Sequence, residues 1–210
     1  MKKKNALKLS ICIPTYNRSE YLNNCLNSIL LAKSFSSLKF EICISDNGSR
    51  EDILSIINLY KKKGLKINFK RNNKNLGFGL NFYKVVKMAK GEFIWLIGND
   101  DLLYIYALKE LEKLFNKNKD IDFFFINSSS LNSKFVFKHK QPFNTKKIPK
   151  NLYNFSKIKK SQKTKFFNLI NPSVSWDFML AMFLTISRRK KFIKNINILD
   201  KKKLNDPGIW

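Results

Sequence analysis

The stretch Phe93–Asp101 constrains the fold more than any other part of this sequence. Its first five residues are apolar, which predicts a strand that is buried on both faces. Gly98 ends the apolar run, and Asn99, Asp100 and Asp101 follow directly. Two adjacent carboxylates repel each other, and burying them is costly unless a cation lies between them. We therefore interpret the stretch as a strand that delivers two acids to a divalent metal, with a solvated turn that caps the next helix as the alternative.

Strand-like and helix-like segments alternate along the first 127 residues. Apolar runs predict strands at 9–13, 40–44, 65–69, 93–97 and 121–127, and helical spacing of apolar residues predicts helices at 19–30, 53–64, 80–89 and 104–116. We expect Pro14 to stop the first strand and Ser19 to cap the first helix. This order predicts an α/β fold, a Rossmann-type and mostly parallel sheet with helices on both faces.

The second part of the chain lacks such a pattern. We divide the sequence into a ligand-binding core over residues 1–127 and an irregular, basic extension over residues 128–210, on the acceptor side or facing a membrane. Within the extension, residues 132–165 are rich in Lys, Asn and Ser and indicate a mobile loop, a lid or partial disorder. A truncated chain is an alternative reading of this extension.

The charge of the chain is extreme. Its 210 residues carry a formal net charge of +26, and only three acids follow residue 122: Asp177, Asp200 and Asp206. Such a charge suits nucleic acid, a phosphate-bearing substrate or an anionic membrane surface as partner. The cations are nearly all Lys, alongside abundant Asn, Ile and Phe, so A/T-rich codon usage is another source of the charge.

Cysteine usage and hydropathy bear on location. The three cysteines form an odd set without CxxC spacing, which favours a reducing cytoplasm and no metal role for them. The longest apolar run near the end, residues 178–186, is too short to span a bilayer. We therefore expect a cytoplasmic protein, with peripheral binding to the inner face of the membrane as an extension of that hypothesis.

Three polar clusters follow three of the predicted strands, at residues 15–18, 46–49 and 99–101. The carboxyl ends of parallel strands share one edge of the sheet, so we expect these clusters to meet there. An Asx-turn that leads into a helix is the plain alternative for residues 46–49 taken alone.

Together the clusters can hold a nucleotide. Asp46 would accept a hydrogen bond from a uracil or guanine ring N–H, and Thr15 and Asn47 would bind ribose hydroxyls. Asn75 and Gly77 lie in a fourth turn, where glycine permits close approach of a ligand to the backbone. A metal at the paired acids would neutralise a diphosphate.

As a set, these motifs resemble the successive signatures of the family 2 glycosyltransferases, in order and in spacing, over roughly residues 7–127. The residues that carry the resemblance are Ile13-Pro14-Thr15-Tyr16-Asn17-Arg18, Ser45-Asp46-Asn47-Gly48-Ser49, Asn75-Leu76-Gly77 with Asn81, and Gly98-Asn99-Asp100-Asp101. The resemblance implies a GT-A fold, a nucleotide-sugar donor linked to UDP, GDP or dTDP, a divalent Mg²⁺ or Mn²⁺, and inversion at the anomeric carbon.

The motif match also implies roles for single residues. Asp46 would contact the base, Asp101 would face the metal, and Asp100 would lie near the donor ribose or sugar. The donor-binding set is then Pro14, Thr15, Tyr16, Asn17, Arg18, Asp46, Asn47, Arg71, Asn75, Gly77, Asn99 and Asp100. Many relatives carry an acid where this chain has Asn99, and an acid in place of Asn47. One negative charge near the metal is therefore lost.

The implied reaction is a single displacement, in which a carboxylate removes the proton of the attacking acceptor hydroxyl. Residues 180–189 resemble the segment that precedes the base in relatives, which indicates Asp206 as the candidate base. The sequence thus predicts transfer of a sugar to a saccharide or lipid-linked acceptor, in surface polysaccharide or glycolipid biosynthesis. A truncated or inactive donor-binding remnant is one alternative, and a basic nucleic-acid or anionic-surface binding protein is another. The strand-end acids disfavour nucleic acid, because they repel phosphates without a metal.

Overall fold

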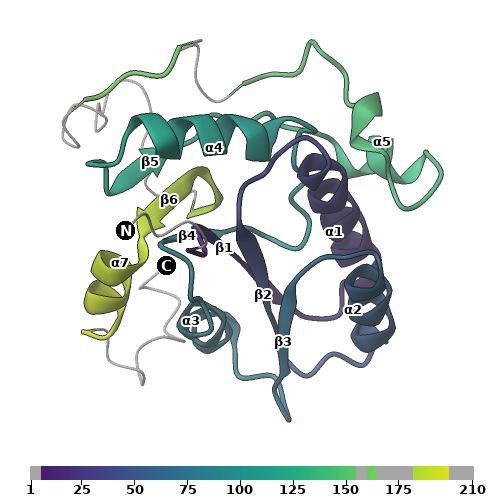
Figure 1. The fold of residues 1–210 in the computed structure, drawn as a ribbon. Coiled ribbons are helices and arrows are strands. Elements are labelled where there is room, and N and C mark those ends of the chain that lie inside the picture. The colour runs from purple at the N-terminus through teal and green to yellow at the C-terminus, as the bar shows by residue number, and fades with distance from the viewer. Residues whose placement is uncertain (1–5, 155–159, 165–181, 199–210) are drawn as a thin grey trace.

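A computed structural model describes residues 6–154, 160–164 and 182–198 of the chain (Figure 1). The strands are β1 (Leu9–Thr15), β2 (Phe40–Asp46), β3 (Ile67–Arg71), β4 (Phe93–Leu96), β5 (Phe123–Phe125) and β6 (Thr185–Arg188). The helices are α1 (Ser19–Lys33), α2 (Ile53–Lys62), α3 (Phe78–Lys87), α4 (Ala107–Lys117), α5 (Ser133–Phe137), α7 (Arg189–Ile196) and the 3₁₀ turns η1 (Thr145–Lys147) and η3 (Met182–Leu184).

Over the described residues, the strands form one six-stranded sheet in the order β3-β2-β1-β4-β6-β5. The first four strands in the chain are parallel neighbours, and β6 runs antiparallel to both β4 and β5. The predicted α/β class with a mostly parallel sheet is therefore confirmed. The chain moves from β1 outward to β3 and then returns to place β4 on the other side of β1. Open sheets of this kind bind ligands at such a reversal point, outside the carboxyl ends of the strands.

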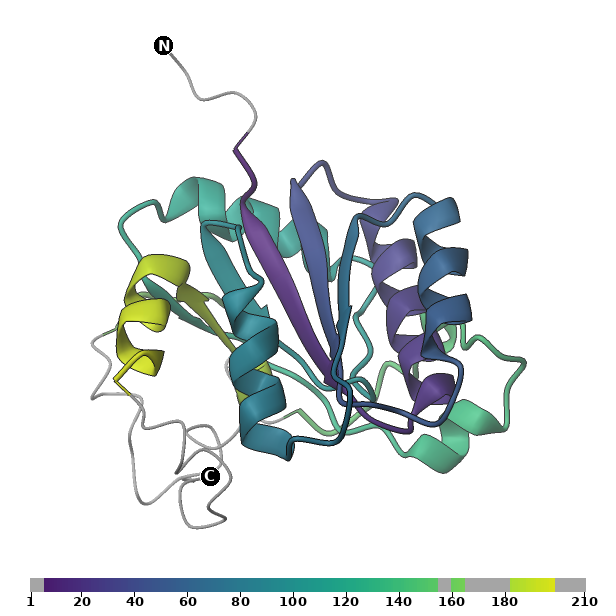
Figure 2. The same ribbon diagram turned by 90° about the horizontal axis from the view of Figure 1, so that it is seen from below.

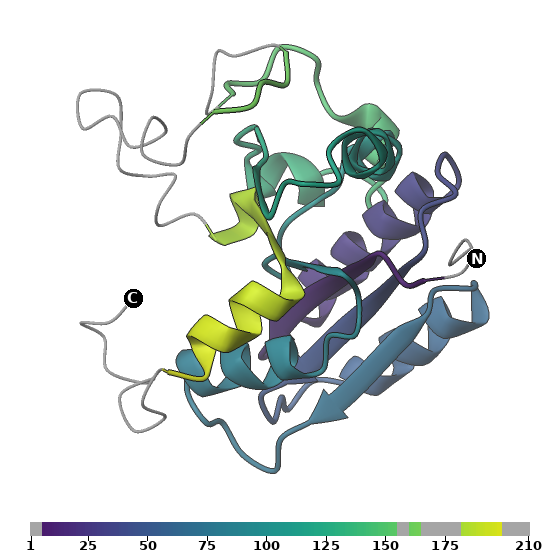
Figure 3. The same cartoon turned by 60° about the vertical axis from the view of Figure 1, so that its left-hand side comes forward.

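Helices cover both faces of the sheet, which explains the continuous apolar strand runs (Figures 1 and 3). Side chains along a strand alternate between faces. Ile11 and Ile13 of β1 therefore pack into the layer of α1, α2 and α4, whereas Cys12 packs against α3 and α7. In β4, Trp95 lies on the face covered by α1, α2 and α4, and Leu96 lies on the face covered by α3 and α7. The cysteines are free and buried in these layers.

The predicted end of the first strand and the predicted cap of the first helix were wrong, because contacts with distant residues decide both. Pro14 does not stop the first strand, because the pairing of β1 with β4 already ends at Cys12 and the missing N–H removes no bond to β4. Ser19 does not cap α1 but is its first residue, and the preceding Arg18 makes no side-chain cap. Instead, the Glu51 carboxylate accepts a hydrogen bond from the Ser19 backbone N–H at 2.6 Å. Hydrogen bonding from the Ser19 hydroxyl, together with this backbone N–H, keeps the pKa of Glu51 below its ordinary value.

Residues that we assigned to the basic extension contribute a strand to the sheet itself. β6 lies between β4 and β5, where Arg188 donates hydrogen bonds to Glu92 and Asp122. The indole N–H of Trp95 donates to the Phe183 carbonyl at 2.7 Å and holds the start of β6. The antiparallel pairing of β6 with β4 therefore joins residues about ninety positions apart in the sequence.

The segment around α5 is docked, although we expected a mobile loop, a lid or partial disorder there. Phe143 is fully buried, and its backbone N–H donates to the Asn24 side chain of α1 at 2.6 Å. The Tyr21 and Phe137 rings meet edge to face at 4.9 Å. Figures 1 and 2 show α5 beside the end of α1 at the edge of the molecule. Within the described ranges, no helix combines the length and apolar character that a bilayer span requires.

Candidate functional site

The loops after β1, β2 and β4 meet at one edge of the sheet, which we call the rim. The Asn47 backbone N–H donates to the Thr15 carbonyl at 2.9 Å and joins the ends of β2 and β1. The Asn99 amide donates to the Thr15 hydroxyl at 2.8 Å and joins the ends of β4 and β1. Asp46 and Asp101 therefore lie on the same edge, separated by the end of β1. The predicted convergence of the three clusters is confirmed, and the ligand roles of their residues remain predictions.

Asp46 is 0% exposed at the end of β2. One carboxylate oxygen accepts hydrogen bonds from both the backbone N–H and the hydroxyl of Ser49. The other oxygen lies 3.4 Å from the Arg71 Nε atom and has no hydrogen-bond partner. A buried carboxylate oxygen without a donor is costly, so this atom is suited to accept from a ligand N–H.

A network of four amides fills the space behind the β2 loop; we call its members, Asn47, Asn72, Asn75 and Asn81, the amide network. Asn47 donates to the Asn75 side chain at 2.7 Å and to the Gly77 carbonyl at 3.2 Å. Its oxygen accepts from the Asn72 amide and from a backbone N–H of the fourth turn. Asn81 bonds both the hydroxyl and the carbonyl of Ser45.

This network gives some of the predicted donor-binding residues a structural role. The Asn47 amide has protein partners for its donors and its oxygen, and through them it positions the turn that contains Asn75. Its contact with a ribose remains a prediction. Gly77 has φ +83°, in the left-handed region that glycine favours. Sequence reasoning missed Asn72, and the run of asparagines at residues 72–75 was the signal that could have found it.

The β1 loop presents its residues differently. Asn17 has φ +48° and is held by Ser49 and by the Arg50 backbone, so it shapes the loop. Tyr16 is exposed at the rim, whereas Pro14 and Arg18 line the large cavity described below. The Arg18 guanidinium donates to Asp100 at 2.9 Å, which places a cation directly beside the paired acids.

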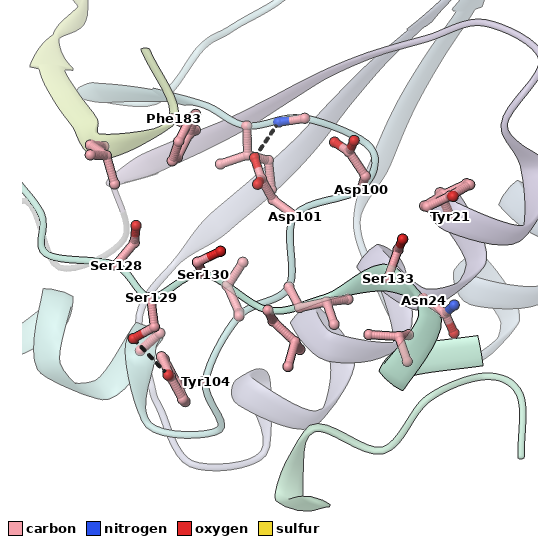
Figure 4. A pocket seen from close by; sticks show the side chains of 18 of the residues that line it. Tyr21, Asn24, Asp100, Asp101, Tyr104, Ser128, Ser129, Ser130, Ser133 and Phe183 are labelled. Carbon is pink, nitrogen blue, oxygen red and sulfur yellow. Dashed lines mark hydrogen bonds between the residues drawn. The ribbon is translucent and has the colours of Figure 1, made fainter. Parts of the chain in front are cut away.

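The β4 loop folds tightly around Gly98. Its backbone N–H donates to the Asp101 carboxylate at 2.6 Å (Figure 4). A Cβ atom at Gly98 would lie 2.5 Å from an Asp100 carboxylate oxygen and 3.2 Å from one of Asp101. A side chain at this position would therefore displace the two carboxylates from their folded-back positions over this turn.

Burial raises the pKa of Asp101 to about 6, the Gly98 N–H opposes that shift, and the neighbouring Asp100 charge adds to it. A cation bound beside Asp101 would favour its charged form and lower this pKa. Among the described residues, no group of three or more His, Cys, Asp or Glu side chains could hold a metal. Mg²⁺ commonly binds one or two carboxylates together with substrate phosphates, so Asp100 and Asp101 fit a metal that arrives with a diphosphate.

A cavity of about 770 Å³ opens beside the acids (Figure 4). Its walls come from the β4 loop, the segment that follows β5, α5 and the start of β6. Apolar groups such as Phe78, Trp95 and Phe183 face a row of hydroxyls at residues 128–130. This volume and this mixture of surfaces are typical of a small-molecule site.

Two polar atoms in the cavity wall are buried without a partner. Asn24 is 2% exposed, and its oxygen accepts from the Phe143 backbone while its Nδ2 has no acceptor. The Ser128 hydroxyl is also unpaired. Both groups would be satisfied by the hydroxyls of a bound sugar or by water. The sequence reasoning did not single out these two residues. The predicted base Asp206, with Asp177 and Asp200, lies outside the described residues.

Comparison with known proteins identifies the family. Residues 10–179 match the model of glycosyl transferase family 2. The chain is 40% identical over 114 residues to abequosyltransferase RfbV of Salmonella typhimurium, a match that covers 54% of this chain and 34% of that protein. It is 32% identical over 105 residues to poly(ribitol-phosphate) β-N-acetylglucosaminyltransferase TarS of Staphylococcus aureus, covering 50% of this chain and 18% of TarS.

Solved structures agree with this assignment. TarS 1–349 in complex with UDP-GlcNAc superposes with a TM-score of 0.54 and 28% identity, over 60% of this chain and 35% of that one. Its complex with UDP reaches a TM-score of 0.66 at 21% identity, over 95% and 52% of the two chains, and shows the shared GT-A-type fold. The matches span about a third of the abequosyltransferase and about a fifth of TarS. Since the family model covers most of the sequence, this chain belongs to glycosyl transferase family 2.

Proposed function

We propose that this chain transfers a sugar from a nucleotide-sugar donor to a saccharide or lipid-linked acceptor, in surface polysaccharide or glycolipid biosynthesis. The observation that carries the proposal is the rim itself. It brings the unpaired oxygen of Asp46, the paired acids of the β4 loop and a cavity of about 770 Å³ to one edge of the sheet. The UDP-GlcNAc complex of TarS supports a donor of this class.

Each part of the rim suits one part of such a donor. The free Asp46 oxygen accepts a hydrogen bond from the ring N–H of the base. Arg71 lies beside this oxygen and forms one wall of the base position. Asp100 and Asp101 would hold a Mg²⁺ or Mn²⁺ ion, which would supply positive charge to the diphosphate. Arg18 adds a second positive charge at the same place. The sugar then projects into the cavity, where the Asn24 amide and the Ser128 hydroxyl meet its hydroxyls.

The reaction that follows is an inverting displacement. The acceptor oxygen forms a bond to the anomeric carbon as the bond from that carbon to the diphosphate oxygen breaks. The leaving nucleoside diphosphate keeps the electron pair, and a carboxylate takes the proton of the acceptor hydroxyl. Asp206 remains our candidate for that base.

A thermal-shift panel of UDP-, GDP- and dTDP-sugars, with and without Mn²⁺, tests donor binding. A donor at about ten times its Kd stabilises the fold by about 1.4 kcal/mol, which raises Tm by about 3–5 °C. We expect one nucleotide to give a Mn²⁺-dependent shift that Asp101→Ala abolishes. Asp120→Ala is the matched control, because Asp120 is an exposed acid whose partner, Lys163, lies away from the rim residues. The absence of a shift with every donor would contradict the proposal.

Release of the nucleoside diphosphate separates an active transferase from a donor-binding remnant. An active enzyme releases it faster when acceptor is added, whereas a remnant binds the donor without acceptor-dependent turnover. Asp206→Asn should abolish that release and leave the donor-induced thermal shift unchanged.

A further inference from the structure

Helices α3 and α7 form a surface that contains no acid. Neither the sequence from residue 72 to 91 nor that from 189 to 198 contains an Asp or a Glu. Figure 2 shows the two helices side by side in front of the sheet, and the Phe82 and Phe192 rings lie 6.5 Å apart between them. The lysine-bearing outer side of these helices, with Lys90 that follows α3, is called the α3/α7 face.

Both helices turn their lysines outward. α3 buries Phe82, Val85 and Val86 against the sheet and exposes Lys84 and Lys87. On α7, Ile196 is buried, and the exposed cations are Lys190, Lys191 and Lys194. Lys191 is paired with Asp122 at the border of the face, and Lys87 reaches an asparagine of α7. The remaining positive charges have no acid on either helix to offset them.

The opposite face of the sheet is different, although it also carries many lysines. Asp52, Glu110 and Glu112 lie on or beside α2 and α4, among Lys61, Lys62, Lys109 and Lys113. Codon usage alone would spread positive charge over both faces. What distinguishes the α3/α7 face is that no acid on its two helices offsets its lysines, and such a face suits an anionic surface.

Apolar groups border the same face. Phe78 begins α3 and is 56% exposed, and Ile198 follows α7 and is 78% exposed. Exposed apolar side chains beside lysines are typical of proteins that lie on a bilayer, since lysine stems cover apolar surface while the ammonium groups reach the headgroups. Phe78 also lines the cavity, so a bilayer along this face would reach the cavity mouth.

We propose that the α3/α7 face docks on an anionic membrane surface, with Phe78 at the interface. Nucleic acid is disfavoured, because base and phosphate recognition favours arginine, and Arg189 is partly buried and donates to the Gly91 carbonyl. Docking of this kind would present a lipid-linked acceptor at the cavity. The docking itself does not depend on the proposed transferase activity, and the two are tested by separate measurements.

Flotation with vesicles tests the docking. We would compare phosphatidylcholine vesicles with vesicles that contain about 30 mol% phosphatidylglycerol. Each lysine near an anionic surface contributes roughly fivefold to binding. The quadruple variant Lys87→Gln, Lys90→Gln, Lys190→Gln and Lys194→Gln should therefore lose at least about tenfold in partitioning to the anionic vesicles. Phe78→Ser should lose about threefold to tenfold, consistent with an aromatic ring at the interface.

A matched quadruple variant controls for net charge. Lys61→Gln, Lys62→Gln, Lys109→Gln and Lys113→Gln remove the same charge from the other face, and we expect a change of less than about threefold. Thermal melting verifies that both variants fold. Equal losses in the two variants, or no preference of the parent for anionic vesicles, would overturn the proposal. Loss of single-stranded RNA binding in the first variant with unchanged vesicle binding would assign the face to nucleic acid instead.

Discussion

The two sides of the rim hold their acids in opposite ways. On the β2 side, Asp46 is enclosed by the Ser49 donors and by Arg71, and the amide network behind it is bonded within the protein. On the β4 side, Asp101 receives the Gly98 N–H and has a pKa raised to about 6 by burial. The first side is bonded within the protein except for one Asp46 oxygen, whereas the second keeps a buried carboxyl group beside another acid.

This difference indicates how binding energy is distributed. A preorganised base site loses little conformational entropy when a nucleotide binds. The β4 side keeps Asp101, whose pKa is raised by burial, and the cavity keeps two unpaired polar atoms. A metal with a diphosphate would satisfy the acid, and a sugar would satisfy the polar atoms. Substitutions on the first side should therefore reduce stability, and substitutions on the second should reduce binding.

The largest effect is expected from Asp46→Ala. This change leaves the Ser49 N–H without its acceptor and the Arg71 guanidinium without its ion-pair partner, and the free energy of unfolding should fall by about 3 kcal/mol. Urea denaturation measures the change. Asp52→Ala is the control, since Asp52 accepts the Ser55 N–H in the same way but at an exposed helix end, and it should cost much less. Similar losses of unfolding free energy in both variants would show that the buried surroundings of Asp46 do not matter for stability.

Asp101→Asn should stabilise the metal-free protein by about 2 kcal/mol near pH 7.5. The folded pKa of Asp101 lies above its unfolded value, so its contribution to stability is present at about pH 4 and is lost as the pH rises through about 6. The Asn variant should lack that dependence, and the curves of the two proteins should meet near pH 4. Denaturation at several pH values measures this. A variant less stable than its parent at pH 7.5 would show that the negative charge of Asp101 does not destabilise the folded protein.

Asn99→Asp should have a moderate effect at the point where the two sides join. It replaces the amide that donates to Thr15 and adds a third charge beside the paired acids, so we expect a loss of about 1 kcal/mol without metal. Saturating Mn²⁺ should reverse the loss, because the additional charge attracts the cation. Melting curves with and without Mn²⁺ decide this, and a loss that Mn²⁺ does not reduce would argue against a cation at the β4 loop.

The smallest effect on stability is expected from Ser128→Ala. The Ser128 hydroxyl has no partner, so its removal should change the unfolding free energy by less than about 0.5 kcal/mol. Ser49→Ala, on the preorganised side, should cost about 1–2 kcal/mol, because that hydroxyl bonds Asp46 and the Asn17 N–H. Ser128→Ala should instead raise the apparent KM for donor or acceptor. An unchanged KM together with a large loss of stability would assign Ser128 to the fold.

Local sequence was sufficient for most of the sheet. The strand at residues 93–97 was predicted from an unbroken apolar run, and the helix at residues 19–30 from apolar residues at a period of 3.6. Contacts elsewhere in the chain do not alter either pattern. The meeting of the three polar clusters was also predictable, because parallel strands bring their carboxyl ends together. The same reasoning could not find the cap of α1, since its acceptor Glu51 is 32 residues away in the sequence.

The sequence by itself determined the class of the sheet, the edge at which the polar clusters meet and the acids placed there. Only the tertiary structure decided that β6 lies between β4 and β5, that Asn47 positions a turn, and that the two acids differ in their surroundings. The physical reason is that burial and hydrogen bonding depend on which distant residues become neighbours. A carboxylate carries the same charge in every sequence, and its neighbours in the folded chain determine whether that charge is paired or left for a ligand.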